Sequence, residues 1–430
     1  MKKLALISMV VLLGSSGLLL AEAKVTWGGT FYTYGFFWNN ADFDDDTKDG
    51  DMYYYMHGDI GATAEFENGL VIRADVTDWG VFGKHPISGA GQEGVGAHLR
   101  EAYLRINNLF DSPVSFTIGK EHFLYGYQFF DGGEDGVTGI RFNLTTDVLD
   151  ANVFAYRLEE WGGFYEKKII TDGDTIPVYN AAGRWGIIGD DKDLYGLYAT
   201  AKLMDGKVNI SGYAMNRQLG IAPDTVESPI WLGIRSEGSP IQGFNYVFEF
   251  TTMMGDNGMG VDYKGMHYMV QVGYTPANIP LTVGAAYLTF TGDDTETDEN
   301  EAYENPLGGP YTYGFYKWWP GFGPAWTVRT PYGFACNPSN MVVINGNVGY
   351  SFGPCTIRLD FFKYDLHRPV KTDEKEVKNL FNEIGVFLLY NYKDVVHLGF
   401  TSGILMPNKD LWGDDATNAL GGYFFVSKSF

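Results

Sequence analysis

Cysteine, basic residues and long hydrophobic runs are all scarce in this chain, and each shortage argues against a class of protein. The 430 residues contain two cysteines, and neither follows the N-terminal apolar run, which disfavours a lipid-anchored form. Lysine and arginine number 31 against 53 aspartates and glutamates, and the net charge of −22 disfavours nucleic-acid binding. Beyond residue 23 no run of about 18 apolar residues occurs, which excludes helical membrane spans.

The N-terminal segment has the three parts of a secretory signal peptide. Lys2 and Lys3 form a charged start, residues 4–20 are mostly apolar, and Ala21-Glu22-Ala23 is a typical cleavage site. We therefore predict a signal peptide over residues 1–23 and a mature chain over residues 24–430. Removing two lysines and one glutamate changes the net charge from −22 to −23.

Tyrosine, phenylalanine and glycine are abundant, with 29, 30 and 56 copies. This composition is typical of a membrane β-barrel with aromatic girdles. The last ten residues alternate as a closing strand would, with Phe424, Val426 and Phe430 on the face expected to meet lipid. This ending resembles the C-terminal signature that the barrel-assembly machinery of Gram-negative bacteria recognises through its final aromatic residue. It predicts a location in the outer membrane.

Short alternating segments cover the mature chain, and their connections are short and long by turns. The tight connections carry turn residues, as in Glu67-Asn68-Gly69 and Met204-Asp205-Gly206. Outer-membrane barrels have short periplasmic turns and longer extracellular loops, so we predict an all-β, antiparallel transmembrane barrel of about 18 strands. The expected strands span residues 25–38, 52–66, 70–79, 98–107, 114–120, 139–146, 149–158, 194–202, 207–217, 230–236, 244–253, 263–274, 281–290, 340–352, 356–364, 383–392, 395–405 and 420–430.

A barrel of this width predicts a pore, because barrels of about 16 to 18 strands enclose an aqueous channel. In one clear strand, Leu70, Ile72 and Ala74 alternate with Arg73 and Asp75. A charge that faces lipid at the bilayer midplane costs about 2 to 4 kcal/mol, so the polar set must face the lumen. The predicted pore-lining residues are Asp59, Arg73, Asp75, Glu101, Tyr103, Arg105, Arg141, Arg235, Glu249, Arg358 and Asp360.

These features predict a porin-like channel for passive diffusion of small hydrophilic solutes or ions through a charged lumen. The alternative is a surface-exposed structural or adhesive barrel without a transport role. We expect one group of arginines in the periplasmic half of the channel, because all of them lie close to periplasmic turns. They form either a charged constriction with a mild preference for anions or a set of internal salt bridges. The group consists of Arg73, Arg105, Arg141, Arg235 and Arg358.

Two of the expected extracellular loops, 39–51 and 291–339, contain clusters of aspartate and glutamate. Their spacing does not fit an EF-hand calcium loop, and we predict a solvated acidic rim without a dedicated metal or cofactor site. Calcium binding is the alternative, and a solvated rim is itself compatible with divalent cations that bridge it to lipopolysaccharide. Farther along the second loop, an aromatic segment predicts either a constriction folded into the pore or a lid over its mouth. The aromatic residues are Trp318, Trp319, Phe322 and Trp326.

The histidines and cysteines give no sign of catalysis. His57, His267 and His397 have lumen parity, and none adjoins a serine or carboxylate in a nucleophile motif, so we predict that the protein is not an enzyme. Cys336 and Cys355 lie at opposite ends of an expected strand that spans about 35 to 40 Å. Their thiols are therefore expected to stay unpaired, because disulfide geometry needs a much closer approach.

A series of short motifs runs from Arg100 to Arg141: Arg100-Glu101-Ala102-Tyr103, Gly119-Lys120-Glu121, Tyr125-Gly126, Asp135-Gly136 and Gly139-Ile140-Arg141. The series resembles that of the alginate-export-like, substrate-specific outer-membrane porins of Gram-negative bacteria. The resemblance implies a monomeric barrel with an arginine-lined lumen, and it places Arg105 and Arg141, together with Arg100 and Lys120, in contact with solute. Lys120 stands where the family-like series has arginine, and lysine lacks the bidentate fork that suits carboxylates.

Overall fold

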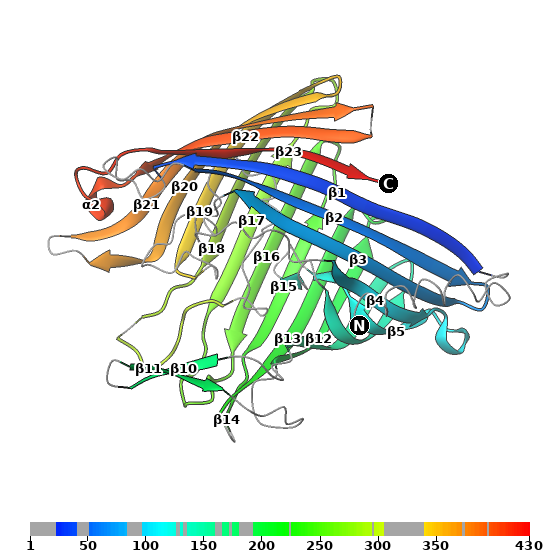
Figure 1. Ribbon diagram of the computed structural model, residues 1–430. Coiled ribbons are helices and arrows are strands. Elements are labelled where there is room, and N and C mark those ends of the chain that lie inside the picture. Colours follow the sequence, from blue (N-terminus) through cyan, green and yellow to red (C-terminus); the bar gives the residue numbers. More distant parts are fainter. Residues whose placement is uncertain are drawn as a thin grey trace.

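The chain forms a closed antiparallel β-barrel in the computed structural model (Figure 1). The structure describes residues 23–40, 51–83, 97–125, 130–131, 136–159, 166–171, 174–179, 192–222, 225–294, 296–304, 339–371, 375–393 and 395–430. Within them, one sheet contains 19 strands. Of these, the short β14 (Thr225–Glu227) and β15 (Ile230–Gly238) pair one after the other with β13 (Val208–Ala222), so the barrel wall is eighteen strands around.

The other barrel strands follow one another in chain order around the wall. They are β1 (Ala23–Asn39), β2 (Asp51–Phe66), β3 (Leu70–Gly83), β4 (His98–Ile106), β5 (Val114–Glu121), β8 (Val137–Thr145), β9 (Leu149–Glu159), β12 (Lys192–Leu203), β16 (Phe244–Met254), β17 (Met266–Tyr274), β18 (Leu281–Phe290), β19 (Met341–Phe352), β20 (Cys355–Lys371), β21 (Glu376–Tyr392), β22 (Val396–Pro407) and β23 (Ala419–Ser429).

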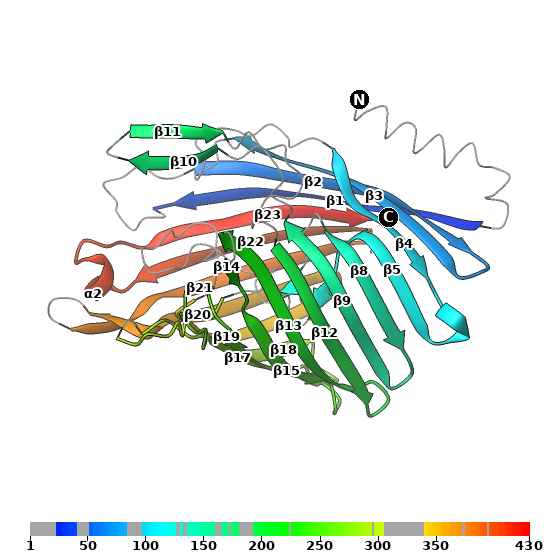
Figure 2. The same ribbon diagram turned by 90° about the horizontal axis from the view of Figure 1, so that it is seen from below.

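Short elements lie in the connections between these strands. The pair β6 (Leu124–Tyr125) and β7 (Phe130–Asp131) forms a separate small sheet. The pair β10 (Glu166–Thr171) and β11 (Asp174–Tyr179) forms another (Figure 2). The helical turns η2 (Leu109–Asp111) and α2 (Lys409–Trp412) are each shorter than two turns of helix. Among the described residues, no helix has the length and apolarity needed to cross a bilayer.

The two ends of the barrel chain pair with each other and close the sheet. β1 pairs with β2 on one side and with β23 on the other, and Thr30 lies opposite Ser429. The backbone amides of Gly29 and Phe430 each donate to the other's carbonyl oxygen at 3.0 Å. The C-terminal segment is therefore the closing strand that its alternation predicts, and a closed barrel leaves no unpaired edge in the membrane.

Alternation along the strands separates an apolar outer face from a polar inner face. On β20, Ile357, Leu359 and Phe361 are 37%, 52% and 46% exposed, whereas Asp360 between them is 4% exposed. Exposed apolar side chains recur on the same outward parity of β8, β16, β19, β21 and β22. This band is the surface that lipid would cover, and the strand parity predicted from the sequence is confirmed.

The predicted strands all appear in order, and the clearest error lies between β20 and β21. Residues 365–382 were expected to form an external loop, but both strands continue through most of this segment as a long hairpin. Leu366, Val377, Leu380 and Phe381 are buried there. Lysines and acidic residues interrupt the apolar pattern of the segment in the sequence, which is why it reads as a loop.

Candidate functional site

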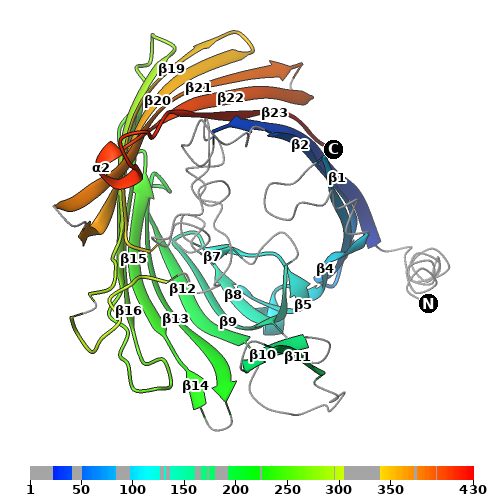
Figure 3. The same cartoon turned by 60° about the vertical axis from the view of Figure 1, so that its left-hand side comes forward.

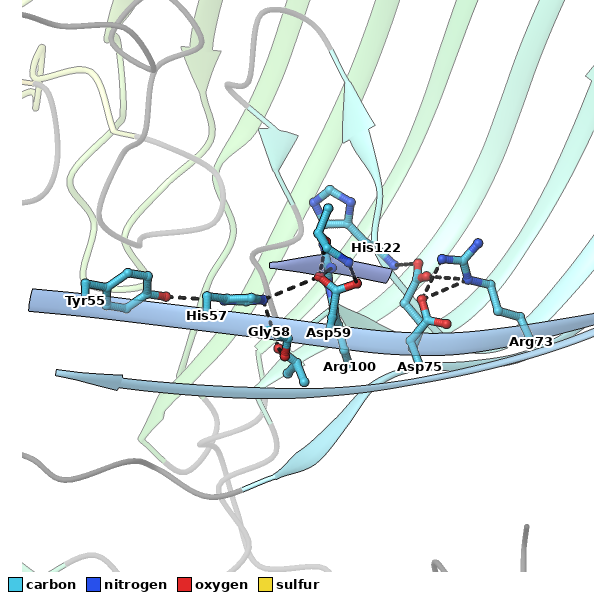
Figure 4. Close-up of polar contacts among 11 residues, drawn as sticks. Tyr55, His57, Gly58, Asp59, Arg73, Asp75, Arg100 and His122 are labelled. Atoms are coloured by element: carbon cyan, nitrogen blue, oxygen red, sulfur yellow. Dashed lines mark hydrogen bonds and ion pairs between the residues drawn. The ribbon is translucent and has the colours of Figure 1, made fainter. Parts of the chain in front are cut away.

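A polar cluster lies on the inner faces of β1 to β4 (Figure 4). The Asp59 carboxylate accepts hydrogen bonds from the Thr30 amide, at 3.1 Å, and from the Thr30 hydroxyl. Arg100 Nη1 lies 3.1 Å from Asp59 Oδ2. Beside this pair is a cavity of about 330 Å³, lined by residues of the same four strands.

Glycine at position 61 makes room for a second charged group at this cavity. A Cβ atom on Gly61 would lie 1.5 Å from Asp75 Oδ1, so only glycine allows the carboxylate to occupy its place. Arg73 Nη2 lies 2.5 Å from Asp75 Oδ2, and Arg73 Nε lies 2.8 Å from Glu101 Oε2. Glu101 also accepts a hydrogen bond from the His122 amide at 2.9 Å. Two carboxylates therefore share one guanidinium.

A β-bulge turns two consecutive residues of β4 toward the lumen. Asp75 on β3 lies opposite Glu101, and the register then shifts so that Arg100 is an extra residue in β4. Strict alternation would place Arg100 on the lipid side, but a bulge re-aims a side chain. Arg100 reaches the inner face instead and donates to Asp59 on β2.

Glu121 at the end of β5 gathers three partners from neighbouring strands. Arg141 Nη2 lies 2.7 Å from Glu121 Oε2, and the Tyr156 hydroxyl donates to Oε1 at 2.9 Å. Arg105 Nη2 lies farther away, at 3.9 Å, and its guanidinium lies over the Tyr103 ring at 4.9 Å from the centroid. Tyr103, Glu121 and Arg141, which belong to three of the motifs between Arg100 and Arg141, thus lie on one part of the wall.

The remaining predicted arginines are paired on other strands. Arg235 Nη1 lies 2.7 Å from Glu249 Oε2 directly across the β15–β16 pair, and Arg235 Nη2 lies 2.5 Å from Glu237. Arg358 Nε lies 2.7 Å from Asp360 Oδ2, two residues along β20. All five arginines of the predicted group therefore lie beside carboxylates, as the salt-bridge alternative predicts.

Burial is unequal within most of these pairs. The Arg73 side chain is 39% exposed and that of Asp75 is 4% exposed, and the corresponding values for Arg358 and Asp360 are 27% and 2%. Arg100, Arg105 and Arg141 are also more exposed than their carboxylate partners. The carboxylates lie deep against the wall while the guanidinium groups reach farther into the lumen. Arg235 is the exception, because both it and Glu249 are buried.

His57 on β2 joins the polar cluster to aromatic neighbours without forming a proton relay. Its Nε2 lies 2.9 Å from the Thr77 hydroxyl and 3.7 Å from Asp59 Oδ2. A relay of the serine-hydrolase type needs the nucleophile and the carboxylate on opposite ring nitrogens, whereas both groups here approach the same one. The Tyr55 hydroxyl lies 3.4 Å from the other nitrogen, Nδ1.

The connection after β5 folds against the inner wall. Phe123 and Tyr125 are buried and stack on inward-facing rings, with centroid separations of 4.6 Å from Phe123 to Tyr156 and 5.2 Å from Tyr125 to Phe154. Burial raises the pKa of the Tyr125 hydroxyl. Figure 3 shows β7, which pairs with β6, within the ring of barrel strands. Phe123 and Tyr125 therefore cover part of the inner wall, and this packing was not predicted from the sequence.

The first part of the 291–339 connection also packs on the inner wall. Tyr303 is fully buried between His267 and Phe290, and the Trp231 indole donates to the Glu304 carbonyl oxygen at 2.9 Å. Burial raises the pKa of the Glu304 carboxyl. The predicted constriction or lid residues Trp318, Trp319, Phe322 and Trp326 lie outside the described residues.

Several inward charged residues were missed by the sequence analysis. Glu121 was noted only as the neighbour of Lys120, yet it is the centre of a cluster. Arg100 was implied only by the family resemblance. Lys120 itself lies opposite Ala102 on the outward parity and donates to the Leu99 carbonyl oxygen at 2.8 Å, so it does not join the inward group.

The acidic segment at the start of the 291–339 connection is held by its own backbone. Glu301 accepts a hydrogen bond from the Asp294 amide at 3.1 Å, and Asp293 accepts one from the Glu301 amide at 3.2 Å. In the part of the chain that the structure describes, no group of His, Cys, Asp and Glu side chains is arranged to hold a metal ion. Cys355 has a free thiol, and Cys336 lies outside the described residues.

Comparison with known proteins gives matches in structure alone. No protein-family model matches the chain, and no curated protein does. Among solved structures, the BenF-like porin from Pseudomonas fluorescens Pf-5 matches with a TM-score of 0.59 at 10% identity, over 95% of this chain and 99% of that one. Acinetobacter baumannii OccAB4 matches with a TM-score of 0.56 at 12% identity, over 96% and 99%.

A third solved structure, Pseudomonas aeruginosa OccK2 (OpdF) in complex with glucuronate, matches with a TM-score of 0.57 at 11% identity, over 95% and 98% of the two chains. The chain therefore has the fold of the Occ and BenF-like porins along nearly its whole length. None of these three structures is described as an alginate-export-like porin.

Proposed function

We propose that this protein is a channel of the Gram-negative outer membrane that lets small hydrophilic solutes and ions diffuse passively through its barrel. The observation that carries the proposal is a closed eighteen-strand wall with an apolar outer band and charged pairs on its inner face. Barrels of this width enclose an aqueous channel, and charged side chains on the inner face are compatible with a water-filled lumen. The likeness in fold to solved porins supports the same conclusion.

The arrangement of the charges favours a mild preference for anions. Four arginines lie on the arc from β3 to β8, and their carboxylate partners are more deeply buried than they are. A permeating ion therefore meets the guanidinium groups first, although the paired carboxylates cancel much of their field. The arginines of this arc are Arg73, Arg100, Arg105 and Arg141.

The N-terminal and C-terminal signals support the location that the proposal requires. The signal peptide over residues 1–23 would take the chain out of the cytoplasm, and Phe430 would present it to the barrel-assembly machinery. Outer-membrane lipid would cover the apolar band, and lipopolysaccharide would surround the acidic extracellular rim. The finer likeness to alginate-export-like porins rests on the motifs between Arg100 and Arg141, of which Glu121 and Arg141 pair with each other in the fold.

Planar-bilayer recording of the refolded protein tests the proposal directly. We expect stepwise conductance that rises with salt concentration, with a reversal potential displaced slightly toward the anion under a salt gradient. A heat-denatured sample is the control. Correctly folded protein that inserts but gives no conductance steps would overturn the proposal and favour the surface-exposed structural or adhesive barrel.

A further inference from the structure

Aromatic side chains form a continuous strip along the inner wall of β1 and β2. Tyr32, Tyr34 and Phe36 share the inward face of β1 and extend over about 13 Å of the strand. The ring centroids of Tyr32 and Tyr34 are 5.4 Å apart, and those of Tyr34 and Phe36 are 5.7 Å apart. Tyr55 on β2 joins them at 6.0 Å from Tyr32. We call these four residues the aromatic strip.

Neighbouring rings hold the strip in place while leaving part of it accessible. Tyr423 and Phe425 on β23 are buried, with ring centroids 5.5 Å and 5.8 Å from that of Tyr34. Each residue of the strip is half-buried, so a portion of every ring remains accessible on the inner side of the wall. Packed aromatic rings lose little further conformational freedom when a solute stacks on them, which makes them an efficient binding surface.

The strip leads into the polar cavity described above. His57 stacks on Tyr32 with centroids 4.6 Å apart and planes at 13°. The Nε2 atom of His57 lies 3.7 Å from Asp59 Oδ2 (Figure 4). Thr30, the next inward residue of β1 before Tyr32, lines the cavity together with Asp59. An apolar surface is therefore continuous with a group of hydrogen-bond donors and acceptors.

The charges around the cavity are already matched to one another. Arg100 pairs with Asp59, and Arg73 is shared by Asp75 and Glu101. Three carboxylates thus face two guanidinium groups, which leaves no surplus positive charge for an anionic solute. The hydroxyls, carboxylates and guanidinium groups remain suited to hydrogen bonding with neutral hydroxyl groups, because both donors and acceptors are present.

We propose that the aromatic strip and the cavity together bind neutral saccharides as they pass through the channel. A pyranose ring offers apolar C–H faces that stack on aromatic rings and hydroxyl groups along its edge that meet the donors and acceptors of the cavity. This inference rests on the proposed function, because the sugar reaches the strip through the lumen.

The test measures the block of bilayer current by glucose, by a linear glucose disaccharide and by glucuronate. We expect half-blocking concentrations that fall from glucose to the disaccharide, since the longer sugar covers more of the strip. Tyr34→Leu keeps an apolar side chain but removes the ring, and should raise the half-blocking concentration about 2- to 10-fold. Phe31→Leu, on the outward face of the same strand, is the matched control and should leave it unchanged.

Titration calorimetry of the detergent-solubilised protein with the same sugars makes the result independent of conductance. The assignment is supported if Tyr34→Leu and Asp59→Asn each weaken both the block of the current and the binding of the sugar. Open channels with no sugar block and no heat of binding would overturn it while leaving the proposed function intact. Glucuronate that binds more tightly than glucose, with the same sensitivity to Tyr34→Leu, would also overturn it, because the site would then select an anion.

Discussion

Arg235 and Glu249 lie directly opposite each other on β15 and β16, with 2.7 Å between Nη1 and Oε2 and side chains that are 4% and 0% exposed. Glu249 accepts a further hydrogen bond from the Tyr213 hydroxyl at 2.9 Å. Breaking such a pair is costly because the remaining ion stays desolvated. The pair therefore stabilises this part of the wall and contributes little to the field that a permeating ion meets.

Replacing one member of this pair should destabilise the barrel far more than replacing both. We expect Arg235→Met to lower the free energy of unfolding by about 3 to 5 kcal/mol, and Arg235→Met with Glu249→Leu to recover most of that loss. Urea unfolding in detergent micelles, followed by tryptophan fluorescence, measures both. Arg368→Gln removes an exposed pair with Asp294 and should cost at most about 1 kcal/mol. Equal losses for the single and double variants would contradict the argument.

The cluster around Glu121 should set the ion preference. It holds Arg105 and Arg141 against one buried carboxylate, a local charge of +1. Changing both arginines to glutamine makes the local charge −1, and adding Glu121→Gln makes it zero. We expect the reversal potential under a salt gradient to move toward cations in the double variant and to lie between the double variant and the wild type in the triple variant. A different order would assign selectivity to the acidic loops.

The sequence predicts which side chains face the lumen wherever polar and apolar residues alternate regularly along a strand. The face of Arg73, Asp75, Arg358 and Asp360 follows from the apolar residues on either side of each. The contact between Glu121 and Tyr156 could not be predicted in the same way, because Tyr156 lies 35 residues farther along the chain. Contacts across strands depend on the register of pairing, and a shift of one residue changes the neighbours of every side chain on the strand.

The bulge in β4 shows the same limit within a single strand. Arg100 and Glu101 alternate smoothly with the residues that follow them, so the sequence assigns them to opposite faces. A bulge adds one residue without any required change in composition at this position. The packing of Phe123 on the inner wall could not be predicted for a related reason. An aromatic residue in a connection carries no sequence signal for the surface on which it packs.

Surface labelling tests the orientation of the barrel in the membrane. Met259 lies in a connection expected to be extracellular and is 74% exposed, whereas Ile241 lies in a connection expected to be periplasmic and is 65% exposed. Short epitope tags after each residue provide a matched pair because the two sites are similarly accessible. The tag after Met259 should be detected on intact cells, and the tag after Ile241 only after the outer membrane is opened. The reverse pattern would invert the topology.

The segment at Phe123 should limit the conductance of the channel. Its ring is buried against Tyr156 on the inner wall, and a Phe→Ala change in such a place removes about 3 to 5 kcal/mol of packing. We expect Phe123→Ala to loosen the connection after β5, which would raise the single-channel conductance and its current noise. Phe116→Ala removes a ring that contacts Phe142 on the outward face, with centroids 4.9 Å apart, and it should leave the conductance unchanged. Similar recordings from the two variants would mean that this connection does not narrow the path.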